Sequence, residues 1–229
     1  MSTAKILVVD DDPAVRNLIH RYLSKQEYTV EAAEDGKTAL TTFDQLNPDL
    51  VILDVNLPDT TGYSLCQEMQ ERTGVFVMML TSRSDEEDVV QGFQRGADDY
   101  LTKPFSLVEL GARVSAVLKR QRIVTPAAAK CITAGSLSID PSSREVMFAD
   151  KPIALTALEF DLLHFLASHP NRVWRRSELL QEVWDYDYVG EPRVVDVHIG
   201  QIRRKIEAFS DEQSRIQTVR GVGYKFEIP

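Results

Sequence analysis

The sequence feature that most constrains the fold is the apolar run from Leu50 to Leu53, which ends on the carboxylate of Asp54. An unbroken apolar run of this length is typical of a strand buried on both faces of a parallel sheet. Pro58 and Gly62 then end the strand and allow a sharp turn. Open α/β sheets bind ligands at the carboxyl ends of their strands, so Asp54 is a candidate functional residue. An isolated aspartate at a strand end can equally cap a helix or face solvent.

The same pattern recurs along the first half of the chain. Short apolar strands are expected at residues 5–9, 28–33, 50–53, 75–80 and 100–101. Helical periodicity follows each strand, at about residues 13–23, 39–46, 62–72, 85–95 and 106–121. This alternation predicts an α/β fold with a doubly wound, flavodoxin-like parallel sheet of five strands.

Polar side chains stand at four of these strand ends: Asp10 and Asp11, then Asp54, Thr81 and Lys103. The carboxyl ends of parallel strands share one edge of the sheet, so these side chains should converge. Clustered carboxylates repel one another unless a cation joins them, and oxygen ligands with phosphate chemistry favour Mg²⁺. Lys103 and Thr81 would supply donors for phosphoryl oxygens. We therefore hypothesise that Asp54 accepts a phosphoryl group.

Residues 1–122 resemble a response-regulator receiver domain, because they carry Asp10-Asp11, Asp54, Thr81, Tyr100 and Lys103-Pro104 in the family's order. The resemblance implies that a sensor histidine kinase phosphorylates Asp54. It also implies a Mg²⁺ site, with Asp11 as a direct ligand and Asp10 acting largely through water. The remaining implied residues are the backbone carbonyl of Asn56 at the metal, and Thr81, Tyr100 and Lys103 as the phosphoryl-binding and switch residues.

The same resemblance implies that the phosphorylated protein dimerises through the surface of the helix expected over 85–95, the last strand and the last helix of the receiver domain. Surface ion pairs are individually weak, so several would have to act together. The expected contributors on this face are Asp98, Asp99, Glu109 and Arg113.

Composition sets the number of domains and the class of protein. A chain of 229 residues is long enough for two domains, and we expect a receiver domain over 1–122, a linker over 123–131 and a second domain over 132–229. No apolar run approaches the roughly 18 residues of a membrane span, and no signal peptide is evident. Cys66 and Cys131 show no metal-ligand spacing or disulfide framework, so a cytoplasmic protein is expected.

The second half begins with short strands and ends with a hairpin. Strands are expected at 137–139, 145–148 and 153–155, helices after Thr156, from Ser177 and over about 192–209, and a hairpin over 216–226. Thr156 and Glu159 have the spacing of a capping box. Strands, three helices and a hairpin in this order predict an α+β winged-helix domain.

The helix expected over 192–209 carries the functional prediction for this domain. Its apolar residues Val195, Ile199, Ile202 and Ile206 form one stripe, which should be buried. A basic face packed by its opposite side suits the major groove of DNA, although a solvated helix face is the simpler alternative. The predicted outer face carries Arg193, Val197, His198, Gln201, Arg204 and Lys205.

Residues 132–229 resemble the effector domain of the OmpR/PhoB family, through Val194 to Ile199 and Thr218 to Tyr224 in particular. The resemblance implies that these residues approach double-stranded DNA: Arg193, Val197, His198, Gln201, Arg203 and Arg204 on the helix, Trp184, Thr218 and Tyr224 near phosphates, and Arg220 in the wing. At Gly200-Gln201 many relatives carry basic residues. Gln201 could instead read an adenine.

The sequence therefore predicts a two-component response regulator and not an enzyme. Its expected partners are a sensor histidine kinase, double-stranded DNA, a second copy of the chain upon phosphorylation and, as a further candidate, RNA polymerase. One competing class is a phosphohydrolase with an aspartyl-phosphate, but such enzymes place a second acid where this chain has Asn56. The other competing class is a regulator that works without phosphorylation. The complete set of acidic and basic residues at the strand ends argues against that class.

Overall fold

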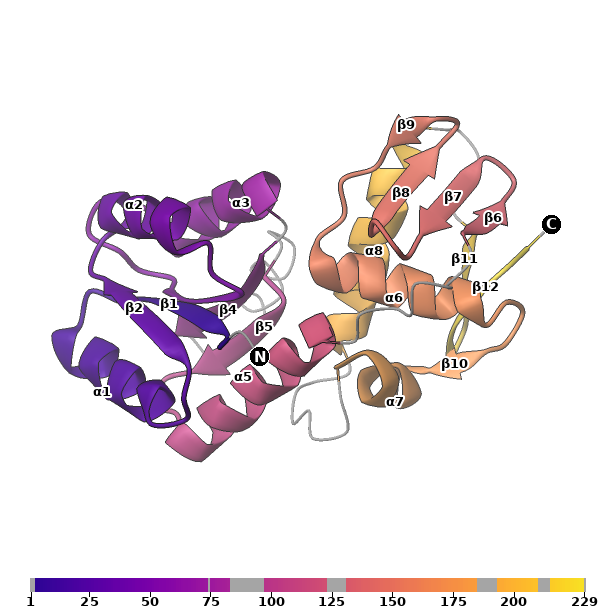
Figure 1. The fold of residues 1–229 in the computed structure, drawn as a ribbon. Helices are drawn as coiled ribbons and strands as arrows, with labels where there is room; N and C mark the ends of the chain where they lie inside the picture. The colour runs from indigo at the N-terminus through magenta and orange to yellow at the C-terminus, as the bar shows by residue number, and fades with distance from the viewer. Residues whose placement is uncertain are drawn as a thin grey trace. The chain divides into compact units, whose positions relative to one another are not determined.

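The computed structural model describes residues 3–73, 75–82, 97–122, 131–184, 193–209 and 215–228. The chain divides into two compact units, Met1–Arg122 and Ile123–Pro229 (Figure 1). The predicted linker over 123–131 and the predicted helix over 85–95 lie outside the described residues, apart from Cys131. None of the helices within the described ranges is long and apolar enough to cross a membrane.

The first unit contains a five-stranded parallel sheet in the order β2-β1-β3-β4-β5. Helices α1 and α5 cover one face of the sheet, and α2 and α3 cover the other (Figure 1). The strands are β1 (Lys5–Val9), β2 (Thr29–Ala33), β3 (Leu50–Asp54), β4 (Phe76–Thr81) and β5 (Asp99–Thr102). The helices are α1 (Pro13–Ser24), α2 (Gly36–Leu46), α3 (Gly62–Thr73) and α5 (Leu107–Arg122). The predicted flavodoxin-like fold is confirmed.

The central strands are buried because helices cover both faces of the sheet. Every residue of β3 and β4 is buried, which explains why these strands read as continuous apolar runs. Strand order reverses on either side of β1, whose neighbours are β2 and β3. In open α/β sheets this reversal leaves a crevice at the carboxyl ends, so the acidic residues after β1 and β3 are placed together.

Local sequence signals fix where the helices around this edge begin. Asp12 caps α1 by accepting a hydrogen bond from the Ala14 N–H at 2.8 Å, and Pro13 occupies the first helical turn. Asp35 caps α2 by accepting from the Thr38 N–H at 2.7 Å. Both helices therefore start within a few residues of the carboxyl end of a strand, close to the crevice.

The second unit contains two antiparallel sheets and a set of helices. One sheet has the order β6-β7-β8-β9 and the other the order β10-β12-β11. The strands are β6 (Ile132–Ala134), β7 (Leu137–Asp140), β8 (Glu145–Phe148), β9 (Lys151–Pro152), β10 (Trp174–Arg175), β11 (Ile216–Val219) and β12 (Gly223–Phe226). The helical segments are α6 (Ala157–Ser168), α7 (Arg176–Leu179), the π-helical η1 (Leu180–Trp184) and α8 (Arg193–Glu207). The predicted winged-helix architecture is confirmed.

The structure departs from the predicted strands of this unit at three places, the first of which is β6 (Ile132–Ala134), a strand that was not predicted. The strand expected over 153–155 lies instead at β9, because Ala154 and Leu155 leave the sheet to reach the helix cap. That cap is the predicted capping box, in which Thr156 and Glu159 bond each other's backbone N–H groups. Strand β10 was not predicted, because two residues are too few to show an alternating pattern.

The two cysteines differ in environment, and neither forms a disulfide. Cys66 lies on α3 and is buried, and burial, together with the negative charge of Asp98, raises the pKa of its thiol. Cys131 is exposed immediately before β6.

Candidate functional site

Four polar side chains meet at the carboxyl edge of the parallel sheet. Asp10 follows β1, Asp54 ends β3, Thr81 ends β4 and Lys103 follows β5. Asp10 is fully buried, and Asp54 and Thr81 are 5% and 2% exposed. The structure therefore brings together the side chains that the sequence places at separate strand ends.

The Lys103 amine joins the two buried carboxylates. Its Nζ donates to Oδ2 of Asp10 at 2.7 Å and also contacts Oδ2 of Asp54. Burial raises the pKa of Asp10, an effect that the hydrogen bond and charge of Lys103 oppose. Burial alone would lower the pKa of Lys103, but its bonds to the two carboxylates outweigh burial and raise it. The cluster thus holds one cation against two anions in a partly desolvated place.

Three carboxylates of this edge fit a divalent cation. One oxygen each from Asp10, Asp11 and Asp54 lies within 4.8 Å of the others. Asp11 is exposed, whereas the other two are buried, so the group is open to solvent on one side. A set of hard carboxylate oxygens with access to water is what Mg²⁺ requires, since this ion keeps part of its water shell.

The loop after Asp54 places Asn56 beside these acids. The Asn56 N–H donates to Oδ1 of Asp54 at 2.8 Å, and Asn56 forms a bridge with Thr61 across the loop. Gly62 closes the loop by donating from its N–H to the Val55 carbonyl at 2.8 Å. A Cβ at Gly62 would lie 2.1 Å from the Asp54 carbonyl oxygen, so only glycine fits there.

The predicted switch pair lies inside the domain. Thr81 is 2% exposed and Tyr100 is 8% exposed, on the adjacent strands β4 and β5. The Tyr100 ring therefore belongs to the interior in this structure, and its hydroxyl is buried.

Three of the four residues expected on the dimer face form one network within the chain. The Arg113 guanidinium lies 2.9 Å from Oδ1 of Asp99 and 2.9 Å from Oε1 of Glu109. Asp98 is separate from them, because it is 1% exposed and accepts from the Val77 N–H at 2.8 Å. The carboxylate of Asp98 is therefore directed into the sheet and does not extend that surface.

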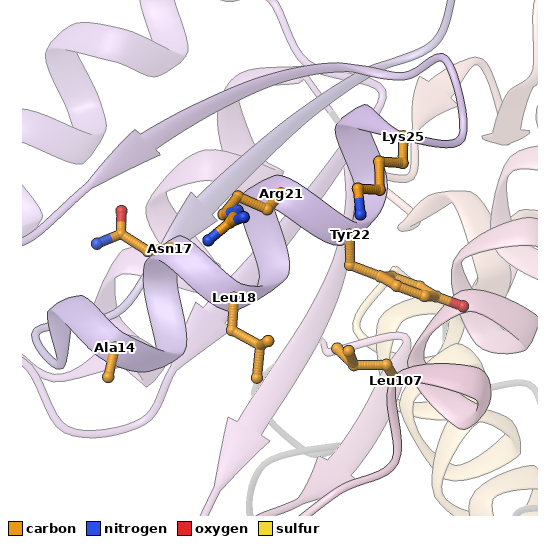
Figure 2. Close-up of a pocket in the computed structure, with 7 residues that line it drawn as sticks. All are labelled: Ala14, Asn17, Leu18, Arg21, Tyr22, Lys25 and Leu107. Carbon is orange, nitrogen blue, oxygen red and sulfur yellow. The ribbon is translucent and has the colours of Figure 1, made fainter.

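A cavity of about 440 Å³ lies between α1 and the start of α5 in the first unit (Figure 2). Leu18 is 49% exposed at the cavity, and Val108 nearby on α5 is 75% exposed. The cavity combines apolar walls with two basic side chains, and its lining residues are Ala14, Asn17, Leu18, Arg21, Tyr22, Lys25 and Leu107.

In the second unit, α8 buries the predicted apolar stripe but also part of the predicted DNA face. Val195, Ile199 and Ile202 are fully buried, as expected. His198 is only 1% exposed, and its ring centroid lies 5.6 Å from that of Trp184, which is itself fully buried. The structure thus corrects the predicted placement of His198 on the outer face, because its ring packs with that of Trp184 inside the domain. The approach of both residues to DNA stays a prediction.

Gln201 is also inside the domain, with 7% of its surface exposed. The structure therefore corrects the placement of Gln201 on the outer face, and its role in reading adenine stays a prediction. Lys205, expected on the outer face, instead donates to the buried Glu159 of α6 at 2.7 Å. Helix α8 therefore packs against the rest of the domain through polar residues as well as through its apolar stripe.

The exposed basic positions of this unit are fewer than predicted. Arg204 on α8 and Arg220 in the wing are exposed, and Val197 is half-buried. Arg203 is engaged with the wing, since its guanidinium donates to the Ile216 carbonyl at 2.7 Å and to Oγ1 of Thr218 at 2.8 Å. Arg193 begins α8, but its side chain lies outside the described residues.

An ion-paired cluster, not expected from the sequence, joins α7, α8 and the wing. Oδ1 of Asp196 accepts from the Tyr224 hydroxyl at 2.6 Å and from Nε of Arg176 at 2.6 Å. Burial, followed by this hydrogen bond to Asp196, raises the pKa of Tyr224 to about 12. Tyr224 was predicted near phosphates, and its hydroxyl is instead bonded within the protein. No sequence periodicity pairs Arg176 with Asp196, because they belong to different helices.

Comparisons with known proteins agree with this geometry. A family model described as a response regulator receiver domain matches residues 6–115. A second model, described as the C-terminal part of transcriptional regulatory proteins, matches residues 150–226.

Whole-length relatives carry both regions. The chain is 42% identical to the alkaline phosphatase synthesis transcriptional regulatory protein PhoP of Bacillus subtilis, covering 98% of this chain and 97% of that protein. It is 41% identical to the transcriptional regulatory protein TrcR of Mycobacterium tuberculosis, covering 100% and 88%. The crystal structure of DrrB, an OmpR/PhoB homologue of Thermotoga maritima, matches with 37% identity and a TM-score of 0.51, covering 99% of this chain and 100% of that one.

The acidic cluster makes a testable prediction about magnesium. Mg²⁺ at about a hundred times its dissociation constant should stabilise the folded protein by about 2.7 kcal/mol, because it binds only the folded cluster. Thermal unfolding with and without Mg²⁺ at constant ionic strength measures this. Asp11→Asn should abolish the gain and leave unfolding without Mg²⁺ nearly unchanged, since Asp11 is exposed. Equal stabilisation of the variant would exclude Asp11 as a ligand.

Proposed function

The chain belongs to the OmpR/PhoB family of response regulators, which are two-component regulators of transcription, and we propose that phosphorylation of Asp54 controls its binding to DNA. The family consists of DNA-binding regulators and not of enzymes, and its receiver and DNA-binding domains identify a histidine kinase and DNA as partners. The observation that carries the proposal is the buried cluster of Asp10, Asp54 and Lys103.

In the proposed reaction an Asp54 carboxylate oxygen attacks the phosphorus of a phosphohistidine on the kinase. The P–O bond to Asp54 forms as the P–N bond to histidine breaks. Oδ1 of Asp54 is already bonded to the Asn56 N–H and Oδ2 to Lys103, which fixes the carboxylate for an in-line approach. When bound, Mg²⁺ would neutralise charge on the phosphoryl oxygens. The Lys103 amine would move from the carboxylates to one of those oxygens, and Asp10, Asp11, Asp54 and the Asn56 carbonyl would be the ligands of the cation.

The proposed output begins at Thr81 and Tyr100. The Thr81 hydroxyl would turn toward the phosphoryl group, and the Tyr100 ring, which lies on the neighbouring strand, would change its packing. In this structure Arg113 is bonded to Asp99 and Glu109 of the same chain. The shift would favour a state in which these three residues form their ion pairs with a second copy of the chain. The dimer would present two winged helices to two DNA half-sites, and recruitment of RNA polymerase is a further proposed step.

For DNA contact we assign the exposed residues Arg204 and Arg220, the half-buried Val197, and Arg193 at the start of α8. Arg203, Thr218 and Tyr224 would help from the hydrogen-bonded surface between α8 and the wing. This surface is basic, whereas the whole chain has a net charge of −9. The contrast supports DNA binding through one local basic patch and not a general affinity of the chain for nucleic acid.

We assign the cavity between α1 and α5 to docking of the kinase. A phosphohistidine must reach Asp54 at the carboxyl edge, and α1 starts directly after Asp12 at that same edge. The exposed apolar side chains of Leu18 and Val108 offer contact area beside the cavity. Arg21 and Lys25 would suit an acidic helix surface on the partner (Figure 2).

Asp54→Ala should abolish phosphorylation. A small phosphodonor with Mg²⁺ should add the mass of one phosphoryl group to the wild-type chain, and the labelled protein should dimerise and bind DNA at least about tenfold more tightly through avidity. Mass spectrometry and DNA titration measure both effects. Asp44→Ala, which removes an exposed carboxylate on α2, is the matched control and should behave as wild type. Labelling that persists in Asp54→Ala would refute the assignment.

Leu18→Glu should slow phosphotransfer from the cognate kinase by about tenfold, because it places a charge in the apolar contact. Labelling by the small phosphodonor should not change, since Leu18 lies outside the acidic cluster. Gln45→Glu adds the same charge at an exposed position of α2 and should have no effect. Equal rates of kinase transfer in wild type and Leu18→Glu would contradict docking at α1.

Arg204→Ala should weaken DNA binding about uniformly across sequences and reduce the salt dependence of log K by about one. Titrations at several salt concentrations give this slope. Lys151→Ala removes an equally exposed charge on β9 and should leave the slope unchanged. If the two variants lose affinity equally, α8 is not the DNA-binding helix.

A further inference from the structure

The loop that carries Asn56 is fastened to the start of α2 by a second acidic residue, Asp59. Oδ1 of Asp59 accepts from the Gly36 N–H at 2.8 Å, and Oδ2 accepts from the Lys37 N–H at 3.1 Å. These N–H groups lie in the first turn of the helix, where backbone donors have no partner within the helix. The hydrogen bond from Gly36, with that from Lys37, holds the pKa of Asp59 below its ordinary value although the side chain is exposed.

Helix α2 does not need Asp59 in order to be capped. Asp35, the residue before the helix, already accepts from the Thr38 N–H at 2.7 Å. Asp35 is local to the helix, whereas Asp59 reaches it from the loop between β3 and α3. The hydrogen bonds of Asp59 therefore join the loop after β3 to the start of α2, which is more than capping the helix requires.

The loop between β3 and α3 is held by contacts at both of its ends. Asn56 bridges Thr61, and the Gly62 N–H donates to the Val55 carbonyl at 2.8 Å. Thr60 packs so closely on Gly36 that a Cβ there would lie 2.4 Å from the threonine methyl group. A displacement at Asp59 would thus be transmitted to Asn56.

The start of α2 is in turn connected to the acids after β1. The Asp10 N–H donates to the carbonyl of Ala33, the last residue of β2, at 3.2 Å. Gly36 follows Ala33 by a short turn. Three sets of hydrogen bonds, Asp10 to Ala33, α2 to Asp59 and Asn56 to Asp54, are thus joined by two short covalent segments, residues 33–36 and 56–59.

We propose that Asp59 is a positioning residue, which sets the distance between Asn56 and the acids after β1 and so tunes the affinity of the cation site. The inference rests on the proposed function, because it takes the Asn56 carbonyl as a ligand. Asp59 does not touch the cation. It acts through the loop, as outer partners of metal ligands do when they orient those ligands.

The test compares Mg²⁺ affinity in the full chain, measured by calorimetric titration with MgCl₂ at constant ionic strength. Asp59→Ala should weaken Mg²⁺ binding by about tenfold, the low end of what losing an outer partner costs. Asp59→Asn keeps one oxygen acceptor and should give an intermediate affinity. Asp35→Ala is the matched control, because it removes a carboxylate from the same helix end without releasing the loop, and its affinity should equal that of wild type.

Thermal unfolding without Mg²⁺ separates positioning from stability. Asp35→Ala and Asp59→Ala should both lower the unfolding temperature, since each loses a cap, yet only Asp59→Ala should lose affinity. If Asp59→Ala fails to fold, Asp59→Asn carries the comparison. Wild-type affinity in both Asp59 variants, or an equal loss in Asp35→Ala, would overturn the inference alone. Absence of Mg²⁺ binding in wild type would overturn the proposed cation site together with it.

Discussion

The receiver unit depends on the electrostatic repulsion between two carboxylates, Asp10 and Asp54, which the fold brings to one edge of the sheet. Parallel strands deliver Asp10 and Asp54 to one edge, bury both, and leave Lys103 to hold them together. Such an arrangement costs stability by itself, because charges with incomplete compensation have lost part of their hydration. The cluster is therefore ready to gain interactions from any ligand that brings positive charge or separates the carboxylates, which is a suitable state for a switch.

The sequence predicted the part of the site that depends on topology. Continuous apolar runs such as Leu50 to Leu53 identify buried parallel strands, and the alternation with helices places their ends on one edge. The sequence could not predict the hydrogen bonds from α2 to Asp59, because a bond between residues 23 apart has no periodic signature. The buried His198 and Gln201 were missed for a related reason, since helical periodicity defines one packed stripe and not the further contacts that other elements make.

The winged-helix unit uses much of its polar character internally. Lys205 compensates the buried Glu159, Arg203 is bonded to the wing, and Tyr224 is bonded to Asp196. The bonds of Arg203 and Tyr224 join α8 to the wing, and that of Lys205 joins α8 to α6, so the helix is held on two sides before any nucleic acid is present. A prearranged surface loses less conformational entropy on binding, so a small number of exposed cations can suffice.

The unequal environments of the two thiols have a practical consequence. Cys131 is exposed immediately before β6, whereas Cys66 is buried and its pKa is raised, so it holds little reactive thiolate. A maleimide fluorophore should therefore attach selectively at Cys131 without any engineered mutation. Its emission anisotropy would report in real time how the surroundings of β6 respond to a phosphodonor, in the native sequence.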